Sequence, residues 1–275
     1  MSPAAPLVIL TFIAYFLLRA VVVVGPAMLF VARSRFAQAR RVYRRTFADG
    51  QMRSELRAGL ITIVFDGVLV GLLRATGAVP LGEPGVVESL LQFALLFVWF
   101  EIWFYVTHRA LHLKPLYFLH AQHHVAKVTH PLTSLSFGIA ERAILQSGAL
   151  LFVFGVGAVW PLSLKVIVGY FLFNYLLNVV GHLNVELFPA SFGRSALGRV
   201  LYSVSFHAMH HARYTGHYGL FTVVLDRAFG TAWEDYPEVQ RRAAMGDGLT
   251  TLGARAAMTP AHAQTCARPQ ADVRS

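Results

Sequence analysis

The chain has 275 residues, of which 56% are hydrophobic and only 14% are charged, and its formal net charge is +10. A soluble domain carries about 25% charged residues, so this composition favours an integral membrane protein. The single cysteine, Cys266, excludes an internal disulfide and any site built from several thiolates, such as an iron–sulfur cluster. No separate basic domain or recognition motif accompanies the positive charge, so we expect no nucleic-acid partner.

Five apolar segments are long enough to cross a membrane, which takes about 20 mostly apolar residues. In chain order they cover residues 7–31, 60–79, 86–106, 137–160 and 164–180. We therefore predict an all-α, polytopic integral membrane protein with four to five transmembrane helices. The first segment has no basic stretch before it and no small-residue cleavage site, which predicts an uncleaved anchor rather than a signal peptide.

The loop after the first segment is rich in arginine. Between Arg33 and Arg57 there are eight arginines but only two acidic residues. Such an excess beside a membrane segment is typical of a cytoplasmic loop. If this loop is cytoplasmic, the second segment crosses the membrane outwards and the third returns, which places residues 108–124 in the cytoplasm. The fourth and fifth segments cross out and back in the same way, which brings His182 and residues 207–211 to the same side. We therefore predict a cytoplasmic, histidine-rich helical cap.

The sequence divides into three predicted parts. Residues 1–58 hold the N-terminal anchor helix and the basic loop, and residues 59–236 form the main membrane domain. Towards the end, the composition shifts to Ala, Gly, Thr, Arg and Gln with little periodicity. We therefore predict that residues 237–275 are a largely disordered tail.

Eight histidines fall in three short clusters in the predicted cap. The first cluster has the pattern H-x-x-x-H, and the second and third both have the pattern H-x-x-H-H. Spacings of three and four place two imidazoles on one helix face, where both can reach one ion. Neutral imidazole suits iron, zinc and copper, so the clusters predict a metal site. The eight predicted ligands are His108, His112, His120, His123, His124, His207, His210 and His211.

A ninth histidine, His182, lies at the cytoplasmic end of the fifth apolar segment, one turn after Asn178. Nine imidazoles exceed the four ligands of zinc and the six of an octahedral metal, which predicts two ions. Iron is favoured because no carboxylate lies inside the clusters, whereas a hydrolytic zinc site usually includes one. Two alternatives stay open: a zinc-dependent membrane hydrolase, and a non-enzymatic metal-binding or metal-transport membrane protein.

The order of the clusters resembles that of the fatty acid hydroxylase / sterol desaturase superfamily of membrane di-iron enzymes. His108-Arg109 at the start of the first cluster is similar to that superfamily, as are Tyr218-Gly219 and residues 225–231 after the third cluster. The resemblance covers about residues 90–233. It implies that the eight clustered histidines are iron ligands, and that His182 corresponds to an additional histidine between the second and third clusters.

The resemblance also implies a reaction. Two iron ions, with O2 as co-substrate, would hydroxylate or desaturate a C–H bond of a membrane lipid such as a sterol or a fatty acyl chain. The sequence has no G-x-G-x-x-G motif and no fused cytochrome signature. We therefore expect electrons from an external ferredoxin or cytochrome b5-like donor.

Five further polar residues are candidates to support the ligands. Glu101 and Glu141 lie in apolar segments and are expected to accept the free N–H of a ligand histidine, with an ion pair to arginine as the alternative for Glu141. Asn178 is expected to pair with His182. His130 is expected to have a supporting or structural role, with direct contact to the metal as the alternative. His217 stands where the superfamily often has Asn before Tyr-Gly, so it is either an extra or supporting ligand or a polar turn residue.

Overall fold

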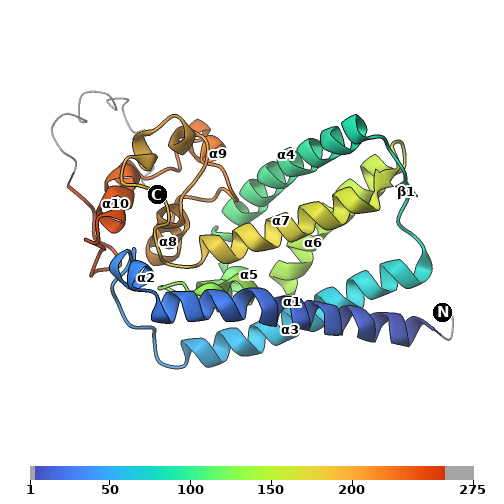
Figure 1. Cartoon of the computed structure of the whole chain (residues 1–275), viewed down its shortest axis with the longest axis horizontal. Helices are drawn as coiled ribbons and strands as arrows, with labels where there is room; N and C mark the ends of the chain where they lie inside the picture. Colours follow the sequence, from blue (N-terminus) through green and yellow to red (C-terminus); the bar gives the residue numbers. More distant parts are fainter. Residues whose placement is uncertain (1–3, 258–275) are drawn as a thin grey trace.

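The computed structural model describes residues 4–257, and the fold is built almost wholly from helices (Figure 1). Five of them are long and apolar enough to cross a membrane: α1 (Ala5–Arg33), α3 (Gln51–Thr76), α4 (Val86–Leu111), α6 (Ile139–Gly157) and α7 (Leu164–Gly181). The prediction of an all-α, polytopic membrane protein is confirmed, and the five helices coincide with the five predicted segments.

Two of these helices extend well beyond their apolar segments. A helix rises about 1.5 Å per residue, so the 26 residues of α3 and of α4 span about 39 Å, whereas the hydrocarbon core is about 30 Å thick. The extra turns lie at one end of the bundle. There α3 begins with the buried residues Gln51 and Glu55, and α4 ends with the buried His108. Both helices therefore contribute directly to the cap.

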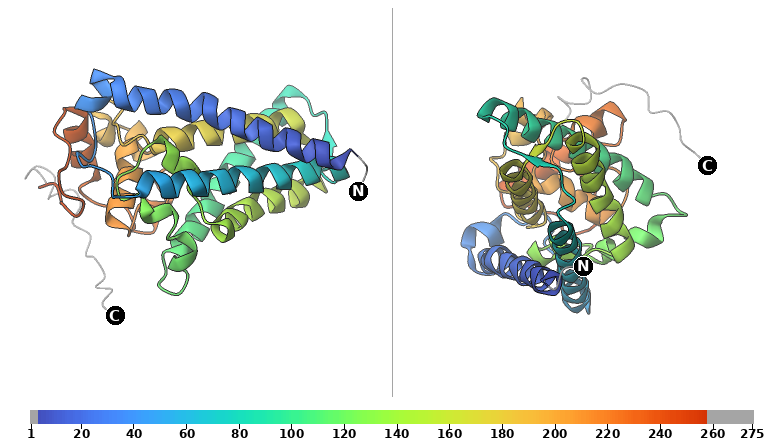
Figure 2. Two further views of the ribbon diagram at one scale, coloured as in Figure 1. Left: turned by 90° about the horizontal axis from the view of Figure 1, so that it is seen from below. Right: turned by 90° about the vertical axis from the view of Figure 1, so that its right-hand side faces the viewer.

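The membrane helices form two groups that are visible end-on in Figure 2. Helices α1 and α3 pack as a close pair, while α4 packs against both α6 and α7. The close approach of the pair depends on Gly67 and Gly71, because a Cβ atom at either position would lie within 3 Å of Ile13 or Ile9 atoms. A G-x-x-x-G spacing of this kind is typical of tightly packed membrane helices.

The shorter elements gather mainly in the cap, at the end where α1 and α7 finish (Figure 1). The opposite end carries a short parallel pair of strands, β1 (Leu81–Gly82) and β2 (Leu162–Ser163). The cap elements are α2 (Arg35–Ala39), α5 (Tyr117–His120), η1 (His123–Val125), η2 (Pro131–Leu135), η3 (Phe192–Arg194), η4 (Leu197–Arg199), α8 (Val204–Arg213), α9 (Val224–Ala228) and α10 (Tyr236–Ala244).

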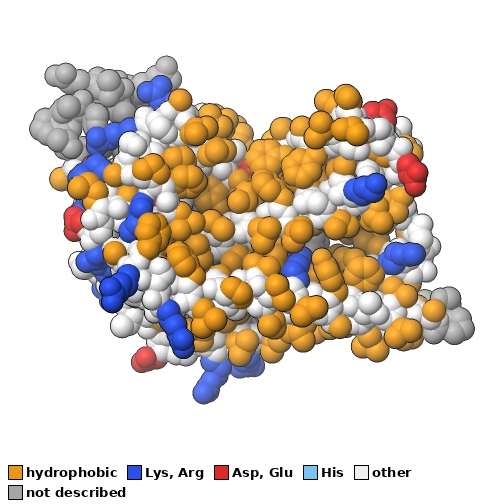
Figure 3. All heavy atoms as spheres, viewed as in Figure 1, with side chains coloured by type: hydrophobic (Ala, Val, Ile, Leu, Met, Phe, Trp, Pro, Cys, Tyr) orange, Lys and Arg blue, Asp and Glu red, His pale blue; other side chains and the backbone are white. Residues whose placement is uncertain are grey.

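The surface of the helical bundle is apolar. Leu7 is 70% exposed and Val86 is 78% exposed, which is expected for side chains that face lipid rather than water. Figure 3 shows this apolar surface, hollowed between α7 and α1, with most of the visible lysines and arginines over the cap end. The protein is therefore an integral, multi-pass membrane protein whose charged residues gather mainly around the cap.

The prediction of a disordered tail is wrong for the first part of that segment. Residues 236–244 form helix α10, which packs against α8 and η3, and its Val239 and Ala243 are buried. Leu249 is also buried, against Val42 and Tyr43 of the basic loop. The helix was missed because it is short and mostly polar, with a single face turned inwards. Residues 258–275, including Cys266 and the rest of the predicted tail, lie outside the described residues.

Candidate metal centre

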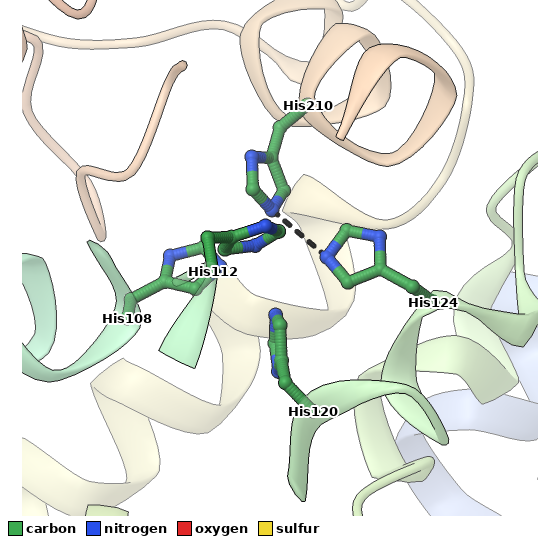
Figure 4. A group of neighbouring side chains, drawn as sticks. All are labelled: His108, His112, His120, His124 and His210. Carbon is green, nitrogen blue, oxygen red and sulfur yellow. Dashed lines mark hydrogen bonds between the residues drawn. The ribbon is translucent and has the colours of Figure 1, made fainter. Parts of the chain in front are cut away.

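The nine predicted ligands lie together in the cap, in two adjacent groups. In each group, one ring nitrogen of every histidine lies within 4.8 Å of a ring nitrogen of every other member. The first group, drawn in Figure 4 with its rings pointing towards a common centre, consists of His108, His112, His120, His124 and His210. The second group consists of His123, His182, His207 and His211.

The two groups in the structure do not correspond to the three clusters in the sequence. Helix α8 places His207 and His211 one turn apart on the same face, and so both join the second group, while His210 points to the first. The second cluster divides in the same way, with His124 in the first group and His123 in the second. The ring centroids of His124 and His211 are 4.7 Å apart, so the two groups are in contact.

Helix α8 is held in position at both ends. At its start, the buried Glu186 accepts hydrogen bonds from the hydroxyls of Ser203 and Ser205 at 2.7 and 2.6 Å. At its end, Arg213 forms two hydrogen bonds of 2.8 Å with the carboxylate of Asp235. These anchors fix the direction in which the three histidines of α8 point.

Most of the nine imidazoles are oriented by their Nδ1 atoms. The Nδ1–H groups of His108, His123, His182, His210 and His211 donate to backbone carbonyls at 2.7–3.0 Å. The acceptors belong to Tyr218, Ser136, Asn178, Gly216 and Ala126, in that order. A hydrogen bond of this kind fixes the ring and leaves the Nε2 lone pair free for a metal. Backbone acceptors have no signature in the sequence, and so these partners could not be predicted.

The free Nε2 atoms converge, and the distances between them show whether these residues fit a metal ion. The Nε2 atoms of His182 and His207 are 2.9 Å apart, those of His207 and His211 are 3.2 Å apart, and those of His123 and His182 are 3.4 Å apart. His123 and His182 both donate through Nδ1, so their Nε2 atoms face each other with lone pairs, which repel. Two ligands about 2.1 Å from one ion at a right angle would be about 3 Å apart. The spacing therefore fits a shared cation.

The first group shows the same pattern. His124 and His210 bring their Nε2 atoms to 3.1 Å, as the dashed line in Figure 4 marks. The Nε2 atoms of His108, His112 and His120 are buried and have no hydrogen-bond partner among residues 4–257. Buried nitrogens without a partner destabilise a protein unless something else binds them. These three atoms therefore also fit a metal ion.

The nine histidines of the two groups are neutral at physiological pH. Burial lowers the pKa of His182 and the pKa of His210 to about 4, although the carbonyl partner of each ring acts in the opposite direction. Burial and the neighbouring His123 and His207 rings hold the pKa of His211 well below its usual value. Neutral imidazole is the form that binds metal, so protons do not compete for these nitrogens near neutral pH.

The two predicted acids behave differently. Glu141, in the first turn of α6, places its Oε1 atom 2.6 Å from Nδ1 of His120, and this is the contact expected of a carboxylate that supports a ligand. Glu101 contacts none of the nine imidazoles. Its carboxylate accepts the backbone N–H groups of Phe221 and Thr222 at 3.0 Å and so holds the loop after α8 against α4. The expectation that Glu101 directly supports a ligand is wrong.

Asn178 and His130 have different roles. Asn178 supports His182 through its backbone carbonyl, not through its side chain as we predicted. His130 pairs with the buried Glu55 and packs on Phe47, and it does not belong to either group. Its role is therefore structural, one of the two roles expected for this residue.

His217 is bonded through both nitrogens. Its Nδ1–H donates to the carbonyl of Phe206, and its Nε2 accepts the backbone N–H of Trp233, both at 2.8 Å. No lone pair is left for a metal, so the alternative in which His217 is an extra ligand is wrong. Its φ of +59° lies in the left-handed region, which asparagine tolerates well, and this agrees with the Asn that the superfamily often has there.

A pocket opens from the histidines towards the membrane helices. On the ligand side it touches both groups, through His120, His123, His182 and His207. Its remaining wall is mostly apolar and includes Phe104, Phe137, Tyr202, Leu220 and Phe221. Of these residues, only Phe104 had a signal in the sequence, because it lies one turn before His108 on α4.

On the side away from this pocket, two partly exposed tyrosines cover the first group. Tyr214 lies 5.3 Å from the ring of His124, and Tyr117 lies 5.8 Å from the ring of His112, centroid to centroid. His112 is itself the one member of the nine that is not fully buried. The centre thus has an apolar side and a side near the surface.

Comparison with curated proteins gives relatives that are much longer than this chain. The chain is 32% identical to "Very-long-chain aldehyde decarbonylase GL1-6" of Oryza sativa over 53% of its own length and 24% of that protein. It is 32% identical to "Protein CER1-like 1" and 30% identical to "Very-long-chain aldehyde decarbonylase CER1", both of Arabidopsis thaliana, over 62% of its length and 28% of theirs. It therefore spans about a quarter of the length of these relatives.

No solved structure matches the chain. Residues 93–231, half of the chain, match the family described as "Fatty acid hydroxylase". The match contains all nine histidines of the two groups, as well as Glu141 and most of the lining of the pocket. The chain therefore belongs to the fatty acid hydroxylase family, as the resemblance of its histidine clusters predicts.

Proposed function

We propose that the protein is an O2-dependent di-iron oxidoreductase that oxidises a C–H bond of a membrane lipid. The observation that carries this proposal is the pair of buried histidine groups, whose Nε2 atoms converge beside an apolar pocket. Each group would hold one iron ion. Iron bound there would supply the oxidising power that an unactivated C–H bond requires.

The donor set favours iron over zinc. Among the described residues, both groups consist of histidine alone, and Glu141 contacts His120 at Nδ1, the nitrogen that points away from the centre of the group. A hydrolytic zinc site usually includes a carboxylate ligand or a carboxylate base beside the metal. Metal transport is also disfavoured, because the imidazoles gather in the cap rather than along the membrane helices.

The protein's own residues have three tasks in this reaction. The Nδ1 hydrogen bonds hold most of the rings in place, and Glu141 keeps the Nδ1–H of His120 directed away from the centre. The pocket wall, with Phe104, Phe137 and Leu220, aligns an apolar chain and excludes water. Hydroxylation or desaturation also consumes two electrons, and we expect these from an external ferredoxin or cytochrome b5-like protein that binds on the cytoplasmic side.

The relatives favour a second candidate within the same class of chemistry. Two of them are named for very-long-chain aldehyde decarbonylation. On this chain the same centre would then convert a long-chain aldehyde, with O2, four electrons and four protons, into a hydrocarbon that lacks the carbonyl carbon, which leaves as formic acid together with one water. The two candidates share the iron site and the apolar pocket, and they differ in the product.

Lipid analysis after expression in a host that lacks the protein tests both candidates. Hydroxylation adds one oxygen atom to a lipid, desaturation removes two hydrogen atoms, and decarbonylation shortens the chain by one carbon. Each product should require O2 and a reductant and should disappear in His123→Ala. Bound zinc instead of iron, together with a product that forms without O2, would contradict the proposal.

A further inference from the structure

A second pocket continues from the first into the membrane helices, and its wall is unexpectedly polar. The two pockets share Phe104, Phe137, Asn178 and Leu220, so they are contiguous. Besides apolar residues of α4, α6 and α7, the second pocket is lined by a polar band, which we define as Arg142, Gln146, Asn174 and Asn178. Polar residues inside membrane helices are costly and usually mark a ligand or a partner.

Part of the polar band is explained by helix packing. Arg142 donates to both carboxylate oxygens of Asp66 at 2.9 and 2.6 Å, and Gln146 donates to the same carboxylate at 2.8 Å. These bonds connect α6 to α3. They also pair the positive charge of Arg142 with the negative charge of Asp66.

The two asparagines are not explained in this way, because neither bonds to Asp66. The Oδ1 atom of Asn178 is buried and has no hydrogen-bond partner within residues 4–257. Asn174 makes one long contact, 3.5 Å from its Nδ2 to the hydroxyl of Tyr170. A buried amide oxygen without a partner is unfavourable, whereas a ligand that carries an O–H group would satisfy it.

The polar band lies close to the histidines. Asn178 is one helical turn before His182, and Asn174 is one turn further into the membrane. Four residues of helix correspond to about 6 Å, so these amides lie about 6 and 12 Å below His182 along α7. On α6, Arg142 directly follows Glu141, the partner of His120.

We propose that the pocket selects an oxygenated lipid, a long-chain molecule whose uncharged hydroxyl group binds to the polar band with Asn178 as its main contact. The amide of Asn178 can both donate to and accept from such a group. A free carboxylate fits less well, because Asp66 already neutralises Arg142. Binding at this position places the rest of the molecule within reach of the histidine groups. The reaction that follows rests on the proposed function, whereas the binding does not.

Equilibrium binding to the full chain in lipid nanodiscs tests the inference, with radiolabelled 1-hexadecanol and hexadecane as probes and empty nanodiscs as background. The wild type should bind the alcohol at least about 5-fold more tightly than the alkane. Asn178→Leu should weaken binding of the alcohol by about 5- to 100-fold and leave the alkane unaffected. Leu151→Met, on the same helix α6 but outside both pockets, should change neither affinity.

Equal affinity of the wild type for both probes, or an unchanged preference in Asn178→Leu, would overturn the inference. If Asn178→Leu does not fold, Asn174→Leu replaces it and should reduce the preference in the same direction by a smaller factor. Hexadecanoate that binds more tightly than hexadecanol would also contradict the selection of an uncharged group.

The same samples separate this inference from the proposed function, because binding requires neither O2 nor a reductant. A protein that prefers the alcohol but forms no O2-dependent product would contradict the proposed function alone. A protein that oxidises lipids without this preference would contradict the inference alone.

Discussion

The two histidine groups and the surroundings of His130 and His217 are both buried in the cap, yet their imidazoles are bonded differently. In the groups, Nδ1 typically donates to a carbonyl and Nε2 points to other Nε2 atoms. His217 instead uses both nitrogens on the backbone, and His130 pairs with the carboxylate of Glu55. Burial alone therefore does not identify a ligand. A ligand is identified by a free nitrogen lone pair that points towards the free lone pairs of other imidazoles.

From this comparison we predict that the loss of one converging imidazole has the largest effect on lipid oxidation and on bound iron. His207→Ala removes a proposed ligand of the second group and His108→Ala removes a proposed ligand of the first. Each should abolish lipid oxidation and reduce bound iron from about two ions to about one per chain, because the other group keeps its ligands. Elemental analysis of purified protein, together with product assays, measures both effects. Full iron content in either variant would show that the groups are not separate sites.

The predictable part of this centre came from local spacing. The distances between histidines along the chain predict which rings share a helix face, and the number of rings predicts two ions. The apolar segments likewise predict the five membrane helices. Each of these inferences depends on neighbours within a few turns, which the sequence displays directly.

The division into groups could not be predicted, because it depends on how α8 packs against η1 and the ends of α4 and α7. His210 and His211 are adjacent in sequence, but they belong to different groups. Glu101 and Glu141 look alike in the sequence as acids in apolar segments. Only the fold shows that one binds a loop and the other a ligand histidine. Helix α10 was missed for a related reason, since its buried face becomes apparent only against α8.

The next largest effect should follow from neutralisation of Glu141. Glu141→Gln keeps an acceptor for the Nδ1–H of His120 but removes the negative charge that strengthens the ring as a ligand. We expect iron affinity to fall by about 10- to 100-fold, as for other partners of metal ligands. Competition with a chelator measures this change. Glu101→Gln is the matched control, because Glu101 is equally an acid within a membrane helix but contacts no imidazole, and its iron affinity should be unchanged.

A smaller effect on the centre is expected from Glu55, whose partner is the structural His130. Glu55→Ala leaves His130 without its carboxylate and removes the acceptor of Thr133. Each buried donor that is left without its acceptor costs about 1–3 kcal/mol, so thermal stability should fall clearly. The folded fraction should still bind iron with wild-type affinity. A specific loss of iron at normal stability would instead assign His130 a role beside the ligands.

Of these substitutions, one at His217 should change iron binding the least. His217→Asn keeps a residue that tolerates the φ of +59°, but it loses the stacking of the imidazole on Phe206, whose ring centroid lies 3.6 Å away. It also changes the acceptor for the Trp233 N–H, so stability should fall by about 1–3 kcal/mol. Iron content and the activity of the folded protein should stay near wild type, because neither nitrogen of His217 is free. Loss of an iron ion in this variant, with the fold retained, would remove the distinction between converging and backbone-bonded imidazoles.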